Sequence, residues 1–167
     1  MIYVRRGFKQ DNRVSWSYRK AFKEAIQMAE TGRYQDSDKV FGDLIARGGD
    51  VAEALLHRAY VRLRMGRLND ALLDAQRALE QRPDNGVYYM VLGDVQAELK
   101  DWAACYGSFK KATELEKDNG RALFGLGKAA LNLGRKHEAA DHIESALSIE
   151  RNYVLSQWMV ESFQKNT

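Results

Sequence analysis

Apolar residues recur along this chain in columns that lie 34 positions apart, in one unbroken register. Small side chains fill some of these columns, and bulky side chains fill others. The small ones are Ala25, Ala59, Gly93 and Gly127, and Ala78, Ala112 and Ala146, while the bulky ones are Phe41, Phe109 and Ile143, and Met65, Leu99 and Leu133. A repeat of this length indicates a supersecondary unit that buries its apolar face only by stacking on its neighbours.

The segment 52–85 shows the unit most clearly. Apolar residues at helical spacing run up to Gly66, and a second such stripe runs from Asn69 to just before Pro83. We expect Asn69 to be the N-cap of the second helix, because its side-chain oxygen can accept from an otherwise unpaired amide. Two helices of about four turns, joined by a tight turn, would form an antiparallel hairpin.

A turn signal follows the same interval. Glycine stands at Gly32, Gly66 and Gly134, and Lys100 takes the equivalent place in the third copy. Glycine just past an apolar stripe is typical of a helix end. The sequence therefore predicts one tight turn inside each repeat.

This register resembles that of the tetratricopeptide repeat (TPR). In that family a large residue, a small one four places later and a bulky one near the turn precede an alanine–aromatic–alanine spacing that ends at proline. The matching residues are Leu55, Ala59, Leu68, Ala71, Ala78 and Pro83 in 52–85, Tyr89, Leu92, Gly93, Trp102, Phe109 and Ala112 in 86–119, and Leu123, Leu126, Gly127, Ala139, Ile143 and Ala146 in 120–153. A weaker copy spans 18–51 and has Ser37 where alanine is usual.

The resemblance implies an all-α fold, a right-handed superhelix (TPR solenoid) of antiparallel helical hairpins. We expect the TPR domain to span 18–165 and to end in a single capping helix over 154–165. Residues 1–17 would precede it as a basic N-terminal arm, for which a solvated, flexible tail is the simplest interpretation.

Two features of the repeats are interpreted as structural. Arg58 takes a position that is commonly leucine in the family, and we expect it to pair with Asp74 on the facing helix, since a lone buried arginine is costly. Gly125 and Gly127 lie inside a predicted helix, where they would allow close packing rather than cradle a phosphate.

The first helix of each hairpin lines the concave face in proteins similar to this one, and that face is the habitual binding surface. The resemblance therefore implies a peptide-binding groove formed by Phe22, Ile26, Leu56, His57, Tyr60, Arg64, Met90, Val91, Asp94, Phe124 and Lys128. The same register places Arg19, Lys23 and Glu53 on this face, and Trp158 and Met159 would extend it. Such a contiguous apolar patch suits an amphipathic helix or an extended peptide. The alternative is that these residues pack within the superhelix or against the N-terminal arm.

One binding mode of the family is not expected here. Some members grip the C-terminal carboxylate of heat-shock chaperones with lysine, asparagine and arginine side chains. The matching positions hold Phe22, Ile26, His57, Val87 and Gly125. These residues do not supply the amide and cationic donors that a carboxylate requires.

Composition and charge set the broad class. A chain of 167 residues suits one domain with a continuous core. No stretch approaches the roughly 20 apolar residues that cross a bilayer, and no apolar run follows the first arginines. We therefore expect a cytoplasmic protein with neither a membrane span nor a secretory signal.

The net charge of +3 is unevenly distributed. Residues 1–23 hold seven lysines and arginines and one acidic residue, so the rest of the chain is mildly acidic. A basic arm would suit an acidic partner, nucleic acid or an anionic membrane, or belong to an organellar presequence. No motif selects nucleic acid among these.

Candidate chemistry is sparse. Cys105 occupies a column of small residues, which indicates a buried hydrophobe rather than a nucleophile. The histidines are His57, His137 and His142, and the last two are not at the four-residue spacing that aligns two metal ligands on a helix. Acidic residues are scattered over the predicted helix faces. We expect no catalytic, cofactor or metal site.

The leading hypothesis is a non-enzymatic adaptor, or a chaperone-like scaffold, that binds a peptide or amphipathic helix of a protein partner in its groove. One alternative is a self-assembling homo-oligomeric scaffold, in which the apolar residues of the arm, such as Tyr3 and Phe8, join copies. A narrower alternative is a chaperone similar to the type III secretion chaperones that hold translocator proteins. Those chaperones resemble this chain in size and repeat number.

Overall fold

The computed structural model describes the backbone of residues 12–149 and the side chains from Trp16 onward, and within that range the chain forms eight helices and no strand. The helices are α1 (Asn12–Glu30), α2 (Tyr34–Arg47), α3 (Val51–Arg64), α4 (Leu68–Gln81), α5 (Gly86–Glu98), α6 (Trp102–Leu115), α7 (Gly120–Asn132) and α8 (Lys136–Ile149). The predicted capping helix over 154–165, Trp158 and Met159, and the first eleven residues of the predicted arm lie outside the described residues.

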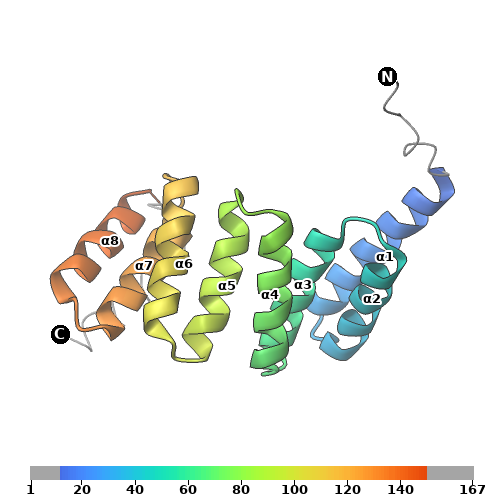
Figure 1. The fold of residues 1–167 in the computed structure, drawn as a ribbon, viewed down its shortest axis with the longest axis horizontal. Helices are drawn as coiled ribbons and strands as arrows, with labels where there is room; N and C mark the ends of the chain where they lie inside the picture. The colour runs from blue at the N-terminus through green and yellow to red at the C-terminus, as the bar shows by residue number, and fades with distance from the viewer. Residues whose placement is uncertain (1–11, 150–167) are drawn as a thin grey trace, which may run out of the picture. The chain divides into compact units, whose positions relative to one another are not determined.

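The chain divides after Arg82 into two compact units. The N-terminal unit holds α1 to α4, and the C-terminal unit holds α5 to α8. Consecutive helices run antiparallel in each unit and form the hairpins α1–α2, α3–α4, α5–α6 and α7–α8 (Figure 1). Hairpins stack through α2 and α3 in one unit and through α6 and α7 in the other. The all-α class of stacked helical hairpins is confirmed.

The first helix is longer than the repeat register indicates. It begins at Asn12, before the predicted start of the first repeat at Tyr18, and spans 19 residues. The first helices of the later hairpins, α3, α5 and α7, span 14, 13 and 13 residues. Residues 12–17, assigned from the sequence to the arm, are therefore helical and continuous with the first hairpin.

Each hairpin turns through one residue in the left-handed conformation. The φ angles are 79° at Gly32, 73° at Gly66, 61° at Lys100 and 78° at Gly134. The residue after each of these donates its backbone N–H to a carbonyl five residues earlier, as Arg67 does to Arg62 over 2.9 Å. This is the Schellman arrangement that satisfies the last carbonyls of a helix. The recurring turn signal is confirmed, including Lys100.

The predicted cap at Asn69 is wrong. The second helix of that hairpin begins at Leu68, and its N-cap is Arg67, whose side chain makes no capping hydrogen bond. The physical reason is the turn, because the left-handed Gly66 reverses the chain so sharply that the next helix starts two residues later. Asp101, which is the equivalent of Arg67 in the next repeat, does cap, since its carboxylate accepts from the N–H of Ala104.

Alanines and a few large side chains build the core of the N-terminal unit. Phe41, Leu44 and Val61 are buried beside Ala25 and Ala54. Between the helices, the predicted pair of Arg58 and Asp74 is confirmed, with Nε–Oδ2 and Nη2–Oδ1 distances of 2.7 Å.

This ion pair belongs to a larger network that the sequence did not indicate. Arg62 donates to Asp74 at 2.8 Å and to Asp38 at 2.7 Å, and Arg67 donates to Asp38 at 3.0 Å. Asp74 is only 1% exposed. The network ties α2, α3 and α4 together, and every buried carboxylate oxygen in it has a donor.

Glycines make the core of the C-terminal unit possible. The ring of Phe109 lies between α5 and α7, where a Cβ atom on Gly93 would lie 2.7 Å from it and a Cβ atom on Gly125 would lie 2.3 Å from it. A Cβ atom on Gly127 would lie 2.8 Å from Ile143. The interpretation of Gly125 and Gly127 as close-packing positions is confirmed.

Candidate functional site

The first helices α1 and α3 carry the predicted groove residues of the N-terminal unit. Tyr60 is 42% exposed, and Arg64 is also exposed. Phe22, Ile26 and His57 are half-buried, whereas Leu56 is buried. The rings of Phe22 and His57 meet edge to face, with centroids 5.2 Å apart, so the structure brings these two predicted residues into contact.

The first helices α5 and α7 carry the predicted groove residues of the C-terminal unit. Met90 and Val91 are buried, and Met90 packs in the core with Phe109 and Leu126. Asp94 and Phe124 are half-buried, and Lys128 is exposed. Leu56, Met90 and Val91 thus offer a partner little surface, since core packing has already covered them.

Asp94 is paired with a neighbouring cation. Arg121 of α7 donates a hydrogen bond to its carboxylate. Burial raises the pKa of Asp94, while the charge and hydrogen bond of Arg121 and the charge of Lys128 oppose that rise. Lys128 is exposed and lies on the same helix as Arg121.

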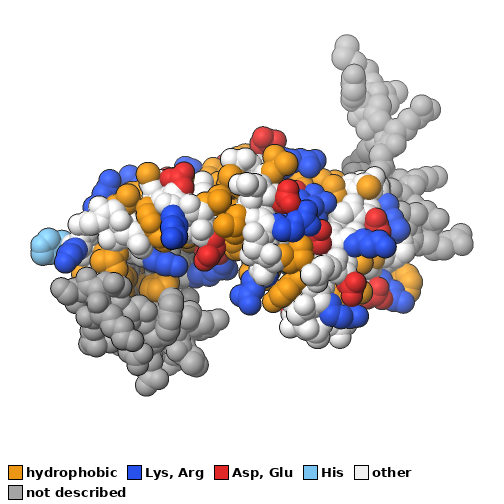
Figure 2. All heavy atoms as spheres, turned by 90° about the horizontal axis from the view of Figure 1, so that it is seen from below, with side chains coloured by type: hydrophobic (Ala, Val, Ile, Leu, Met, Phe, Trp, Pro, Cys, Tyr) orange, Lys and Arg blue, Asp and Glu red, His pale blue; other side chains and the backbone are white. Residues whose placement is uncertain are grey.

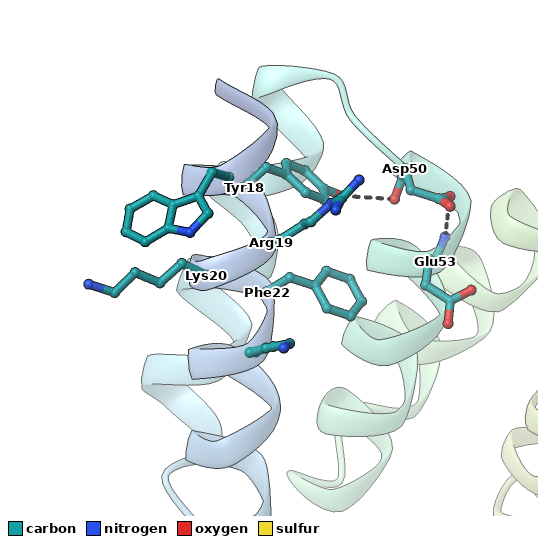
Figure 3. A pocket seen from close by; sticks show the side chains of 8 residues that line it. Tyr18, Arg19, Lys20, Phe22, Asp50 and Glu53 are labelled. Atoms are coloured by element: carbon teal, nitrogen blue, oxygen red, sulfur yellow. Dashed lines mark hydrogen bonds between the residues drawn. The ribbon is translucent and has the colours of Figure 1, made fainter. Parts of the chain in front are cut away.

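A pocket of about 600 Å³ lies between α1 and the start of α3 in the N-terminal unit (Figure 3). Its lining mixes aromatic, basic and acidic side chains: Trp16, Tyr18, Arg19, Lys20, Phe22, Lys23, Asp50 and Glu53. The repeat register places Arg19, Lys23 and Glu53 on this face, together with Phe22. It missed Trp16, because the repeat pattern starts only at Tyr18. It also missed Tyr18, Lys20 and Asp50, which lie inside the first repeat but not at the positions that the register assigns to this face.

Tyr18 and Gly49 fix one wall of the pocket. The tyrosine ring lies so close to the glycine that a Cβ atom there would be 2.4 Å from it. The phenol donates a 3.0 Å hydrogen bond to the backbone oxygen of Asp50. Burial, followed by the charge of Asp50, raises the pKa of Tyr18, so the phenol stays a proton donor at neutral pH. In Figure 3 the side chain of Tyr18 reaches from α1 toward Asp50.

Phe22 forms the apolar floor. Its ring meets Phe41 edge to face at a centroid distance of 5.4 Å and rests on the core of the unit. Burial lowers the pKa of His57 beside it, although Glu53, 3.4 Å from the imidazole, acts in the opposite direction. His57 is therefore largely uncharged at pH 7, and it serves this floor as a ring rather than as a cation.

The charges of the pocket differ in how far they are already paired. Asp50 caps α3 by accepting from the N–H of Glu53, and it also pairs with Arg82. Lys20 lies 3.9 Å from Glu24, and its ammonium group sits 5.6 Å from the centre of the Trp16 ring. No ion pair within 4 Å engages Arg19 or Lys23 in the part of the chain that the structure describes.

The thiol and the potential metal ligands of residues 16–149 are the groups that bear on chemistry here. The free thiol of Cys105 is buried, and burial raises its pKa to about 11, so it is a poor nucleophile at neutral pH. Among residues 12–149, no three histidine, cysteine, aspartate or glutamate side chains gather where they could hold a metal ion.

The surface of the described residues is mixed in character. On the face drawn in Figure 2, hydrophobic side chains form small patches that basic and acidic side chains interrupt. Residues 12–149 contain no helix with the length and apolar character that a membrane span requires.

Solved structures share this fold. MamA from Desulfovibrio magneticus RS-1 (residues 41 to the end) superposes with a TM-score of 0.73 at 19% identity, covering 82% of this chain and 77% of that one. TTC0263, a thermophilic TPR protein of Thermus thermophilus, gives 0.73 at 20% identity over 80% and 75%. The first TPR of Spaghetti (RPAP3), bound to the HSP90 peptide SRMEEVD, gives 0.63 at 19% identity over 68% and 90%.

Sequence comparisons agree with the fold. Superkiller complex protein 3 of Mus musculus is 27% identical in an alignment of 156 positions that covers 86% of this chain and 10% of that protein, so this chain spans a small part of its length. The family model described as tetratricopeptide repeat matches residues 22–85, 58–104 and 107–153. With most of its length matched in this way, the chain belongs to the tetratricopeptide repeat family.

Proposed function

We propose that this chain is an interaction module that binds a peptide segment of a protein partner on the first-helix faces of its hairpins. Family membership and fold support a protein-interaction scaffold at the coarser level. The observation that carries the proposal is the pocket between α1 and α3, which is preformed, lined by first-helix residues and supplied with aromatic and charged side chains. RPAP3, whose TPR was solved with a peptide, gives a precedent for this use of the fold.

The predicted groove residues then divide into two roles. Tyr60, Arg64 and Lys128 are exposed and would contact the peptide directly. The half-buried residues would each present part of a side chain to the peptide, and they are Phe22, Ile26, His57, Asp94 and Phe124. The buried residues would support them from beneath, and they are Leu56, Met90 and Val91. This division explains how a mixed surface retains the apolar anchors that peptide recognition uses.

A peptide-display selection on the immobilised full chain tests the proposal. Random peptides of about 12 residues are selected, and enriched sequences are titrated by calorimetry. Tyr60→Ala is expected to weaken an enriched peptide about tenfold, or about 1.4 kcal/mol, because it removes an exposed aromatic anchor.

Leu73→Ala is the matched control. Leu73 is also an exposed apolar residue of the N-terminal unit, at 55%, but it lies on the second helix α4. Its removal should leave the affinity unchanged. Peptides that depend on Leu73 and not on Tyr60 would place binding on the second helices and refute the proposal.

The narrower roles are further proposals. A chaperone function, a cytoplasmic location and assembly of copies through the N-terminal arm all stay predictions. Light scattering of the full chain and of a chain without residues 1–11 tests assembly, because only an oligomer held together by the arm would dissociate into smaller particles on truncation. The deletion stops at residue 11 so that α1 and its Trp16 remain intact.

A further inference from the structure

We infer that the pocket at α1 recognises an acidic peptide segment that contains a large apolar side chain. The carboxylates of the peptide would meet Arg19 and Lys23, and its apolar side chain would lie on the aromatic lining that includes Phe22 and Trp16. This inference rests on the proposed function and names the chemistry of the partner.

The pocket is a feature of this chain and not of the repeat alone. Trp16 lies before the first repeat register, on the part of α1 that the other first helices lack. Without that extension, the side of the pocket formed by Trp16 would be missing. The later first helices begin at an N-cap, such as Asp50 or Asn85, and the register has Asp50 and Asp84 where the first hairpin has Trp16.

The walls are already held in place. Tyr18 is fixed by its close approach to Gly49 and by its hydrogen bond to Asp50. Phe22 is fixed by edge-to-face contacts with Phe41 and His57. A preformed site loses little conformational freedom on binding, so its contacts contribute more fully to affinity.

An exposed tryptophan is the strongest apolar feature of the pocket. Trp16 is 66% exposed, more than any other large hydrophobic residue that the structure describes. Tryptophan is enriched among the residues that dominate binding energies, because its ring buries a large area and loses little freedom. A large apolar side chain of a partner would cover this ring.

The spare charge of the pocket is positive. The carboxylate of Asp50 is used by the helix cap and by Arg82, and Glu53 lies beside His57. Arg19 and Lys23, in contrast, make no ion pair with an acidic side chain of residues 16–149, and both are exposed. Carboxylates of a partner would form charge-assisted hydrogen bonds with these two cations.

Two competing occupants fit the pocket less well. Residues 1–11 of this chain carry Arg5, Arg6 and Lys9 against Asp11, so the cations of the pocket would repel them. A nucleic acid would bring a row of phosphates, and the acidic wall formed by Asp50 and Glu53 would oppose it. A peptide presents backbone N–H groups as well as carboxylates, so it suits the acidic wall as well as the cations Arg19 and Lys23.

The first test asks whether the pocket sets the charge of the selected peptides. Display on the full chain should enrich aspartate or glutamate near a tryptophan, phenylalanine, tyrosine or leucine. The variant Arg19→Glu/Lys23→Glu should enrich lysine or arginine in the same place and bind the original acidic peptides at least about tenfold more weakly. Lys39→Glu/Arg47→Glu makes the same charge change on α2 of the same unit and should keep the acidic preference.

The second test measures, by the fluorescence of Trp16, whether a peptide covers this side of the pocket. In a chain with Trp102→Phe and Trp158→Phe, Trp16 is the one remaining tryptophan of three. An enriched acidic peptide should shift its emission to shorter wavelength as the ring is covered, and its neutral version, with asparagine and glutamine, should shift it far less at equal concentration. Circular dichroism confirms that the variant is folded.

The outcomes separate this inference from the proposed function. Peptides that depend on Tyr60 but keep their affinity in Arg19→Glu/Lys23→Glu would overturn the inference and leave the proposed function standing. Failure to enrich any peptide would overturn both. Tighter binding of oligothymidylate, or of a synthetic peptide of residues 1–11, at the same Trp16 reporter would show that the pocket serves another occupant.

Discussion

Backbone conformation at a few single residues decides which substitutions this fold tolerates. The hairpin turns require φ near +60° to +80°, which glycine adopts freely and which costs other residues about 1 kcal/mol. Three of the four turns have glycine, and the third has Lys100. The side chain of Lys100 is exposed and participates in no core packing, so backbone strain is its main contribution.

Lys100→Gly should therefore raise the free energy of unfolding by about 0.5–1 kcal/mol, since relief of the left-handed strain exceeds the entropy that glycine adds to the unfolded chain. Urea denaturation followed by circular dichroism measures the change. Gly66→Lys is the reciprocal control and should lower the free energy by a similar amount. Equal stability of both variants and the parent would show that these turns are not strained.

Gly125→Ala should lower the free energy of unfolding by about 2 kcal/mol, because the new methyl group would force Phe109 or α7 to move. The control is Gly107→Ala in α6, where a Cβ atom meets nothing within 4 Å. That change should raise the free energy by about 0.5–1 kcal/mol through helix propensity. A loss of stability in Gly107→Ala would contradict the space that the structure shows there.

At the scale of elements, polar contacts between helices fix the arrangement that alanine packing alone would leave loose. Alanines at Ala25, Ala54, Ala71 and Ala75 let the helices of the N-terminal unit approach, but they provide little shape to select one register. The network around Asp74 has that selectivity, because the planar guanidinium group of an arginine donates two hydrogen bonds to a carboxylate in only a few geometries.

Asp74→Ala should lower the free energy of unfolding by about 3 kcal/mol, because it leaves Arg58 without its carboxylate in a largely buried place. Thermal and urea unfolding measure the loss. Asp70→Ala, which breaks an exposed pair with Arg67, should cost about 0–1 kcal/mol and is the matched control. Similar losses in both variants would mean that the buried network adds nothing beyond an ordinary surface pair.

At the scale of the whole molecule, the sequence indicates the repeated parts and misses the parts that differ between repeats. Four hairpins and their turns follow from a pattern seen several times, while the Arg58–Asp74 pair follows from the cost of leaving a buried arginine alone. The early start of α1, and with it the Trp16 side of the pocket, occurs once and lies outside that pattern. The exposure of Leu56, Met90 and Val91 also could not be predicted, because periodicity shows which face a residue occupies but not how closely neighbouring helices cover it.

Stability in repeat proteins is approximately a sum of local terms and terms between neighbours, so a defect acts most strongly near its own repeat. Cys105 reports on the C-terminal unit, because its thiol is buried there and has a pKa of about 11. At pH 8 only about a thousandth of an accessible thiol with that pKa would be in the reactive thiolate form. Its alkylation by iodoacetamide in native buffer should therefore follow opening of that unit.

Gly125→Ala, in the same unit, should accelerate the alkylation of Cys105 about 30-fold, which corresponds to its expected loss of about 2 kcal/mol. Asp74→Ala, in the N-terminal unit, should change the rate of alkylation less than about threefold, even though its expected loss of stability is larger. The reason is that the free energy of local opening around Cys105 depends mainly on contacts within its own unit. Gly107→Ala should slow the reaction. If Asp74→Ala accelerates alkylation as strongly as Gly125→Ala, the two units open as one cooperative body and the additive description of this chain is wrong.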